Sequence, residues 1–302
     1  MSPNFTAWCT AAALWLLASA VFGQARTDAA GEGATASATA QSASVSSEPR
    51  ASRRARARES SARRRQRRPP SLSVGYANGG ALANGVALVE DDRVRHLPGR
   101  PHHHGTEELV SMVRRAASAV ARDFPGSRLT VGDLSDHDGG PIGHHASHQS
   151  GRDVDLAFYV TDARGRAANL NDYVSFNGQG RPIAGGNLRF DVARNWALVN
   201  ALLDDPAVRV EHIFVSNPLR ALLINHARAI HARPMTLVRA QLVLHQPVRA
   251  LPHSNHFHVR IACPAGDAQC VDGIRPRPRP RRRVASARDS RGHRAPARGA
   301  HR

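Results

Sequence analysis

The chain has 302 residues, of which 41% are hydrophobic and 5% aromatic, so it can bury a core made mainly of aliphatic side chains. Its formal net charge of +18 is carried by arginine, since the chain contains no lysine. Residues 50–68 hold ten arginines and one acidic residue, residues 273–302 hold eleven and one, and the remainder is close to neutral. Because these two blocks lack interleaved aromatic side chains, the charge does not indicate a nucleic-acid-binding protein.

The first 70 residues divide into two segments that are not expected to fold. Residues 1–25 contain an apolar run over residues 7–23 followed by small residues, which predicts a secretory signal peptide; an uncleaved N-terminal anchor is the alternative. Residues 26–70 are rich in alanine, serine and arginine and poor in large apolar groups, so they predict a disordered linker. We therefore expect an exported, periplasmic protein.

Periodic patterns begin at residue 71. Apolar side chains recur at helical spacing over residues 106–124, and Thr106 is a candidate N-cap. Further helices are predicted over residues 190–203 and 219–230, and strands over residues 129–134, 154–160, 208–215, 240–244 and 256–261. Short strands mixed with separate helices predict an α+β fold with a central, largely antiparallel sheet flanked by helices. A single catalytic domain is predicted over residues 71–272, followed by a disordered tail, rich in arginine and proline, over residues 273–302.

Two cysteines follow the predicted signal peptide, Cys263 and Cys270. Their separation in an exported protein predicts a local disulfide that closes a loop, and two free thiols are the alternative. If they are paired, neither can act as a nucleophile, and no Gly-x-Ser-x-Gly motif indicates a serine mechanism.

Histidines and acidic residues gather in residues 144–155 and 253–260. In the second segment, His256 and His258 alternate along a predicted strand, so their imidazoles share one face while the residues between them face the core. Two imidazoles on one face favour a metal site, and neutral imidazole is a common zinc ligand.

In the first segment, His148 ends a loop, and Asp153 and Asp155 share a face of the strand that follows. A carboxylate in an apolar strand is costly to bury unless it is paired or binds a metal. The interpretation as a metal site therefore stands beside an alternative, a salt-bridged pair with Arg152 or Arg260.

Taken together and in this order, the two segments resemble a known family. The stretches GDLS, SHQSGRDVDLAFY, IFVS and PHSNHFHVRIACP resemble the penicillin-insensitive murein endopeptidases, which belong to the wider group of LAS-type zinc metallopeptidases with the lysostaphin-type enzymes and the D-Ala-D-Ala dipeptidases. The resemblance covers residues 71–272. It implies that His148, Asp155 and His258 are zinc ligands, and that the two later cysteines form a disulfide.

The resemblance also implies that His256 is a catalytic histidine that does not bind the metal, and that His253 is a further active-site histidine. His145 matches a position that belongs to a second, interface zinc in some relatives; it is left out of the predicted site because no convincing partners for such a zinc occur here. Three protein ligands leave a fourth position for water, whose pKa zinc lowers to about 7. Without a His-Glu-x-x-His motif to supply a glutamate, His256 is the predicted base, His253 stabilises charge or relays protons, and Asp153 orients a ligand histidine.

The predicted function is that of a zinc endopeptidase that cuts peptide cross-links in peptidoglycan. The resemblance alone implies that the bond joins D-alanine to meso-diaminopimelate. The alternatives are a D,D-carboxypeptidase or dipeptidase on the same scaffold, and a non-catalytic protein that binds the cell wall. The arginine-rich segments either hold the protein near anionic wall or membrane surfaces or act as solvated spacers. The sequence does not reveal the oligomeric state.

Overall fold

The computed structural model describes residues 68–248, 250–273 and 275–276, together with residues 52, 54 and 56. The chain divides into two units, Met1–Ala57 and Arg58–Arg302. In the first unit only residues 52, 54 and 56 are described, and their backbone is helical. The predicted signal peptide lies outside the described residues, as do most of the predicted linker and tail. The fold and the site described below belong to the second unit.

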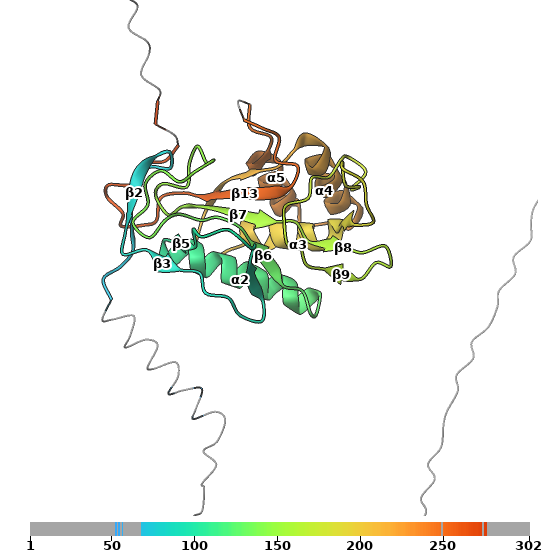
Figure 1. Ribbon diagram of the computed structural model, residues 1–302, viewed down its shortest axis with the longest axis horizontal. Helices are drawn as coiled ribbons and strands as arrows, with labels where there is room; N and C mark the ends of the chain where they lie inside the picture. The colour runs from blue at the N-terminus through green and yellow to red at the C-terminus, as the bar shows by residue number, and fades with distance from the viewer. Residues whose placement is uncertain are drawn as a thin grey trace, which may run out of the picture. The chain divides into compact units, whose positions relative to one another are not determined.

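A six-stranded mixed sheet forms the centre of this unit, with strand order β12-β11-β13-β7-β6-β4. Its strands β13, β7 and β6 are labelled in Figure 1. The strands are β4 Val94–His96, β6 Leu129–Val131, β7 Asp153–Ala157, β11 Val210–Phe214, β12 Leu244–His245 and β13 His256–Ile261. The three inner pairings are antiparallel and the two outer pairings are parallel. The predicted α+β fold with a largely antiparallel central sheet is therefore confirmed.

Three small antiparallel sheets surround the central one. One pairs β1 Leu72–Tyr76 with β2 Gly79–Ala83, a second pairs β3 Val86–Ala87 with β5 His104–Gly105, and a third contains β8 Val160–Thr161, β9 Ala167–Ala168 and β10 Arg189–Phe190. The predicted strand over residues 154–160 is thus divided between β7 and β8, because the chain leaves the central sheet after Ala157.

The described residues of the second unit form four helices: α2 Glu107–Asp123, α3 Val192–Leu203, α4 Asn217–Ala229 and α5 Pro234–Val243. The first three confirm the predicted helices to within a few residues. Thr106 caps α2, because its side chain accepts a hydrogen bond from the backbone N–H of Leu109 at 3.3 Å. The apolar stripe of α2 is buried in the core. None of the described helices is both long and apolar enough to pass through a lipid bilayer.

The prediction of a strand over residues 240–244 is wrong, since most of this segment forms the last turn of α5. The helix begins at Pro234, whose fixed φ and missing N–H suit the first helical turn. Thr236 and Ala240 are four residues apart and both are buried, which is the spacing of one helix face. A short apolar run does not distinguish a strand from a buried helix end, and here tertiary packing decides.

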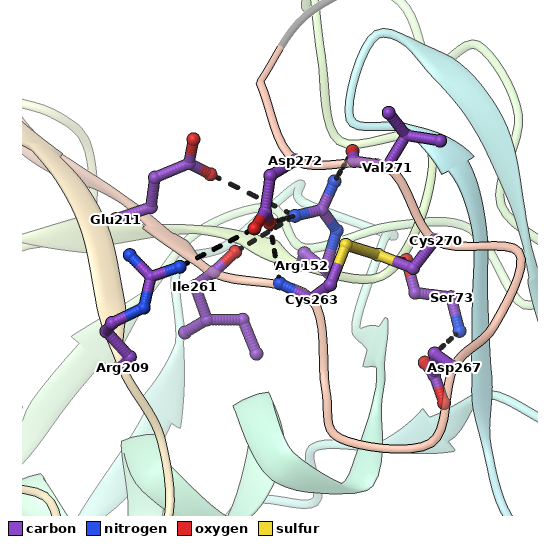
Figure 2. The surroundings of a disulfide bond; sticks show 10 residues. All are labelled: Ser73, Arg152, Arg209, Glu211, Ile261, Cys263, Asp267, Cys270, Val271 and Asp272. Carbon is purple, nitrogen blue, oxygen red and sulfur yellow. Dashed lines mark hydrogen bonds and ion pairs between the residues drawn. A yellow bond between two sulfur atoms is a disulfide. The ribbon is translucent and has the colours of Figure 1, made fainter.

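The disulfide Cys263–Cys270 is present, with an S–S distance of 2.08 Å (Figure 2). The loop that it closes lies against β1. The backbone N–H of Gly75 donates to Gln269 O at 2.8 Å, and the N–H of Ser73 donates to the carboxylate of Asp267 at 2.7 Å. The loop therefore fastens the first hairpin of the domain to the segment that follows β13.

Arg152 connects this loop to the start of β7 (Figure 2). Its side chain is fully buried, and its guanidinium donates to Val271 O at 2.9 Å and to Ile261 O at 3.2 Å. It also lies 3.3 Å from the carboxylate of Asp272, which in turn accepts a hydrogen bond from the N–H of Cys263. These contacts fix the backbone immediately before β7, the strand that carries Asp155.

Candidate metal site and active site

The two central strands place a carboxylate beside an imidazole. β7 and β13 are antiparallel, and His258 lies directly opposite Asp155 in their register. Directly opposed residues project from the same face of a sheet. Phe257 and Leu156, the next opposed pair, project from the other face and are fully buried in the core. The alternation predicted for residues 256–261 is therefore confirmed, and it turns His258 and Asp155 toward the site.

His148 completes this group from the loop that precedes β7. Its Nε2 lies 3.4 Å from Asp155 Oδ1 and 3.2 Å from His258 Nδ1, and His258 Nδ1 lies 3.1 Å from Asp155 Oδ1. All three side chains are buried, with exposed fractions of 0%, 1% and 6% for His148, Asp155 and His258. A tetrahedral zinc ion with bonds of about 2.0–2.1 Å holds neighbouring ligand atoms about 3.3 Å apart. The donor set and its spacing therefore fit zinc.

In each of the two candidate ligand histidines, His148 and His258, the ring nitrogen that points away from the site also has a hydrogen-bond partner. His148 Nδ1 lies 2.7 Å from the carbonyl oxygen of Leu134, and His258 Nε2 lies 2.9 Å from Asp153 Oδ1. When these two nitrogens carry the protons and donate, His148 Nε2 and His258 Nδ1 keep lone pairs that point at the site. His148 also has a φ of +68°, a conformation that non-glycine residues rarely adopt and that is associated with functional positions.

Asp153 supports this arrangement from behind. Its Oδ1 accepts a hydrogen bond from Arg260 Nε at 2.7 Å in addition to the one from His258, and its Oδ2 accepts one from the backbone N–H of His148 at 3.2 Å. The salt bridge to Arg260, one of the alternatives raised by the sequence, therefore exists alongside the contacts to both histidines. One buried carboxylate holds two of the candidate ligands in place.

His145, which the prediction left out, also faces the group. His145, His148 and Asp155 offer ligand atoms that all lie within 4.8 Å of one another, so these three residues could hold a metal ion. His145 Nδ1 lies 3.7 Å from Asp155 Oδ2, and its Nε2 lies 3.2 Å from Asp133 Oδ2. His145 thus approaches Asp155 Oδ2, whereas His258 Nδ1 lies 3.1 Å from Asp155 Oδ1 and 3.2 Å from His148 Nε2. His258 is therefore closer to Asp155 than His145 is.

The structure brings both predicted catalytic histidines to the same place. His256 Nε2 lies 3.5 Å from Asp155 Oδ1, and its Nδ1 lies 2.7 Å from the side-chain oxygen of Asn255. The ring of His253 is centred 4.9 Å from that of His256 and 5.6 Å from that of His258. The two residues therefore form a second row of imidazoles beside the candidate ligands.

Burial and neighbouring charges divide these histidines into two kinds. Burial lowers the pKa of His256 to about 4 and that of His253 to about 3, so both are neutral near pH 7 and His256 can accept a proton. His258 differs: burial alone would lower its pKa, but hydrogen bonds to Asp153 and Asp155 raise the pKa to about 9. In the metal-free protein His258 thus carries a proton that a metal ion must displace.

Two further side chains reach the site from loops that carry no recognisable pattern in the sequence. The ring of Tyr173 is centred 4.8 Å from that of His256, and the guanidinium carbon of Arg100 lies 5.0 Å from the centre of the Tyr173 ring. Burial raises the pKa of Tyr173 well above its usual value, and the nearby carboxylate of Asp155 adds to this effect. The phenol is therefore protonated throughout the neutral range.

Histidine and carboxylate side chains that could hold a metal ion gather on the central strands of the α+β domain, and further histidines that could transfer protons lie beside them, so the site has the donor groups that hydrolases use. Comparison with known proteins identifies the family. Residues 73–280 match the family described as penicillin-insensitive murein endopeptidase, and the chain belongs to this family.

Several curated relatives carry the same description. The chain is 26% identical over 212 residues to a penicillin-insensitive murein endopeptidase from Klebsiella pneumoniae, an alignment that covers 66% of this chain and 71% of the relative. Proteins of the same name from Yersinia enterocolitica and Salmonella arizonae are also 26% identical, over 216 and 218 residues. These alignments cover 69% and 68% of this chain and 72% of each relative.

Proposed function

We propose that this protein is a zinc-dependent murein endopeptidase that hydrolyses peptide cross-links in peptidoglycan, specifically bonds between D-alanine and meso-diaminopimelate. Membership of the family and the names of the relatives support the substrate class. One observation carries the proposal for zinc: His148 Nε2, Asp155 Oδ1 and His258 Nδ1 lie 3.1–3.4 Å from one another in a buried site. This spacing suits a tetrahedral ion with a fourth position open.

The protein's own side chains supply the proton transfers. Zinc, when bound, lowers the pKa of a water molecule and polarises a carbonyl group. Neutral His256 accepts a proton from the attacking water as the new carbon–oxygen bond forms, and it returns that proton to the leaving amine as the carbon–nitrogen bond breaks. His253, beside it, stabilises the charge that develops during these two steps. Asp153 orients the imidazole of His258 throughout.

The proposal extends to the organisation of the chain. Residues 71–272 form the catalytic domain, and residues 1–25 direct export to the periplasm, where the substrate lies. The arginine-rich segments 50–68 and 273–302 contribute a weak electrostatic attraction to anionic wall or membrane surfaces. A protein that lacks both segments and stays on isolated walls as well as the intact one would contradict this role for the segments without affecting the proposed reaction.

The experiment uses the chain from residue 26 onward, purified and assayed for zinc content and for cleavage of cross-linked dimeric muropeptides. We expect about one zinc per chain and conversion of dimers to monomers. His148→Ala should lose the metal, whereas His256→Ala should keep the metal and lose activity. His226→Ala, a histidine on α4 outside the site, is the matched control and should change neither property.

Other outcomes are equally informative. Trimming of terminal residues with the cross-links left intact would indicate a D,D-carboxypeptidase. A protein that binds no zinc, or binds it and leaves both cross-links and termini intact, would refute the enzymatic proposal and favour a role in wall binding.

A further inference from the structure

Tyr173 is one of the side chains at the site that have no role in the mechanism above. It lies between β9 and β10, outside both histidine-containing segments. Its ring is centred 4.8 Å from the imidazole of His256 at an interplanar angle of 33°, so the two rings are in contact. The guanidinium of Arg100 also lies over the Tyr173 ring. The tyrosine is therefore held in a fixed place directly beside the predicted base.

The hydroxyl group of Tyr173 has an unusual environment. It is buried and has no hydrogen-bond partner among the described residues. A methyl group built on Gly132 would lie 1.8 Å from Tyr173 Oη and 3.4 Å from Asp155 Cβ, so the hydroxyl and the candidate ligand flank the same point. The backbone N–H of Gly132 donates to Asp155 O at 2.8 Å, so the backbone at Gly132 lies beside that of the candidate ligand.

Gly132 thus makes room for the hydroxyl, since any side chain at this position would collide with it. A buried hydroxyl without a partner is unfavourable unless another group arrives to accept its proton. The part of the chain that the structure describes offers none, and the hydroxyl lies near the candidate ligand Asp155 and belongs to the ring that contacts His256. A donor in this position matches what the substrate brings: a carbonyl oxygen that gains negative charge when water attacks its carbon.

We propose that Tyr173 is a further catalytic residue, whose phenolic O–H donates a hydrogen bond to the oxygen of the scissile carbonyl as that oxygen becomes negative. The phenol keeps its proton throughout, so the step adds no proton transfer to those of His256. This inference rests on the proposed function, since it names a donor for the same reaction. It predicts that the hydroxyl contributes to the transition state more than to substrate binding.

The first test compares Tyr173→Phe, which keeps the ring contact with His256 but lacks the hydroxyl, with the unaltered chain from residue 26 onward. The expected result is a fall in kcat on cross-linked dimers of about 100-fold, because removal of one such donor typically costs 10²–10³ in kcat. KM should change by less than about threefold, and zinc content should not change.

Tyr159→Phe is the matched control. Tyr159 also has a buried hydroxyl without a hydrogen-bond partner among the described residues, but its backbone groups contact Asn195 and Asp191 at the start of α3, outside the site. This variant should retain full activity. Full activity in Tyr173→Phe would overturn the proposal, even if Tyr173→Leu were inactive, because the ring alone would then matter. Activity of Tyr173→Phe that is restored by excess zinc would overturn it too, because the hydroxyl would then support the metal ligands.

A second measurement needs no turnover. Calorimetry of the zinc-loaded protein with a D-alanyl phosphinate, whose charged oxygen imitates the attacked carbonyl, should show binding weakened about 100-fold in Tyr173→Phe and unchanged in Tyr159→Phe. Equal affinity in all three proteins would overturn the role of the hydroxyl. A wild-type protein that binds zinc and the phosphinate but cuts no cross-link would refute the proposed function, while the comparison of affinities would still decide the role of Tyr173.

Discussion

Replacement of Asp153 by asparagine tests whether the hydrogen bonds that Asp153 accepts from two candidate ligands, His258 and His148, are needed for stability and metal binding. Asp153 is fully buried and contacts Arg260, which is 3% exposed, as well as His258 and the backbone of His148. Asparagine keeps one oxygen acceptor, but it leaves the Arg260 guanidinium without a counter-charge and turns an N–H group toward the N–H of His148. Removal of one partner from a buried ion pair costs about 3–5 kcal/mol. Loss of a carboxylate that orients a ligand histidine typically costs 10–100-fold in metal affinity.

The pKa of Asp153 predicts how the free energy of unfolding changes at low pH. Burial alone would raise the pKa of Asp153, but Arg260 and His258 hold it far below its usual value in the folded protein. The carboxylate therefore stabilises the fold above its unfolded pKa of about 3.9, and this contribution is lost as the pH falls further. Below about pH 4 the free energy of unfolding should decline more steeply in the metal-free wild-type protein than in Asp153→Asn.

The assay is urea unfolding of the metal-free proteins at several pH values, followed by zinc titration against a competing chelator. Arg209→Gln is the control, since the Arg209–Asp272 pair is exposed and such pairs contribute about 0–1 kcal/mol. If Asp153→Asn lost no more stability than Arg209→Gln and bound zinc as tightly as wild type, the supporting role of Asp153 would be refuted.

Three other predictions concern the metal, the space that Gly132 leaves for the Tyr173 hydroxyl, and the disulfide. Because His258 has a pKa of about 9 without metal, zinc must displace its proton, so zinc affinity should rise about tenfold per pH unit below that value; a chelator competition at several pH values tests this, and a flat profile would contradict it. Gly132→Ala should abolish activity, because its Cβ would lie 1.8 Å from Tyr173 Oη. In the Tyr173→Phe protein, the same replacement should lower zinc content and stability much less than it does in the unaltered protein, since the nearest remaining atom, Cζ of the ring, lies at 3.0 Å. Replacement of Cys263 and Cys270 by serine should lower the free energy of unfolding by about 2–3 kcal/mol, the chain-entropy value for so short a loop, and thermal melts that coincide with wild type would count against it.

Local patterns in the sequence were sufficient for the elements that carry the site. The strand predicted over residues 256–261 is β13 as observed, because alternation of buried and site-facing residues is a local property of a strand. The helix over residues 106–124 was predictable from its apolar stripe and from the cap at Thr106. The pairing of Cys263 with Cys270 was predictable in the same way, since they are seven positions apart and the loop can close locally.

Other features depended on contacts between distant segments. The sequence placed His148 and His258 in separate clusters, and only the folded structure shows that a nitrogen of His148, from the loop before β7, lies 3.2 Å from a nitrogen of His258 on β13. No pattern in the sequence marks Tyr173 or Gly132 as partners, and His145 was set aside although it faces Asp155. These relationships arise where loops meet across the sheet.

The sequence by itself therefore determined the elements that carry the site and the chemical types of residue available for it, and it favoured the disulfide that is present. The tertiary structure decided the distances at which the predicted histidines converge, the contacts through which Asp153 supports them and the place, among the described residues, of an unpartnered hydroxyl. The physical reason is that backbone periodicity and short loops act over a few residues, whereas the distances between side chains far apart in the chain are set by packing of the whole domain.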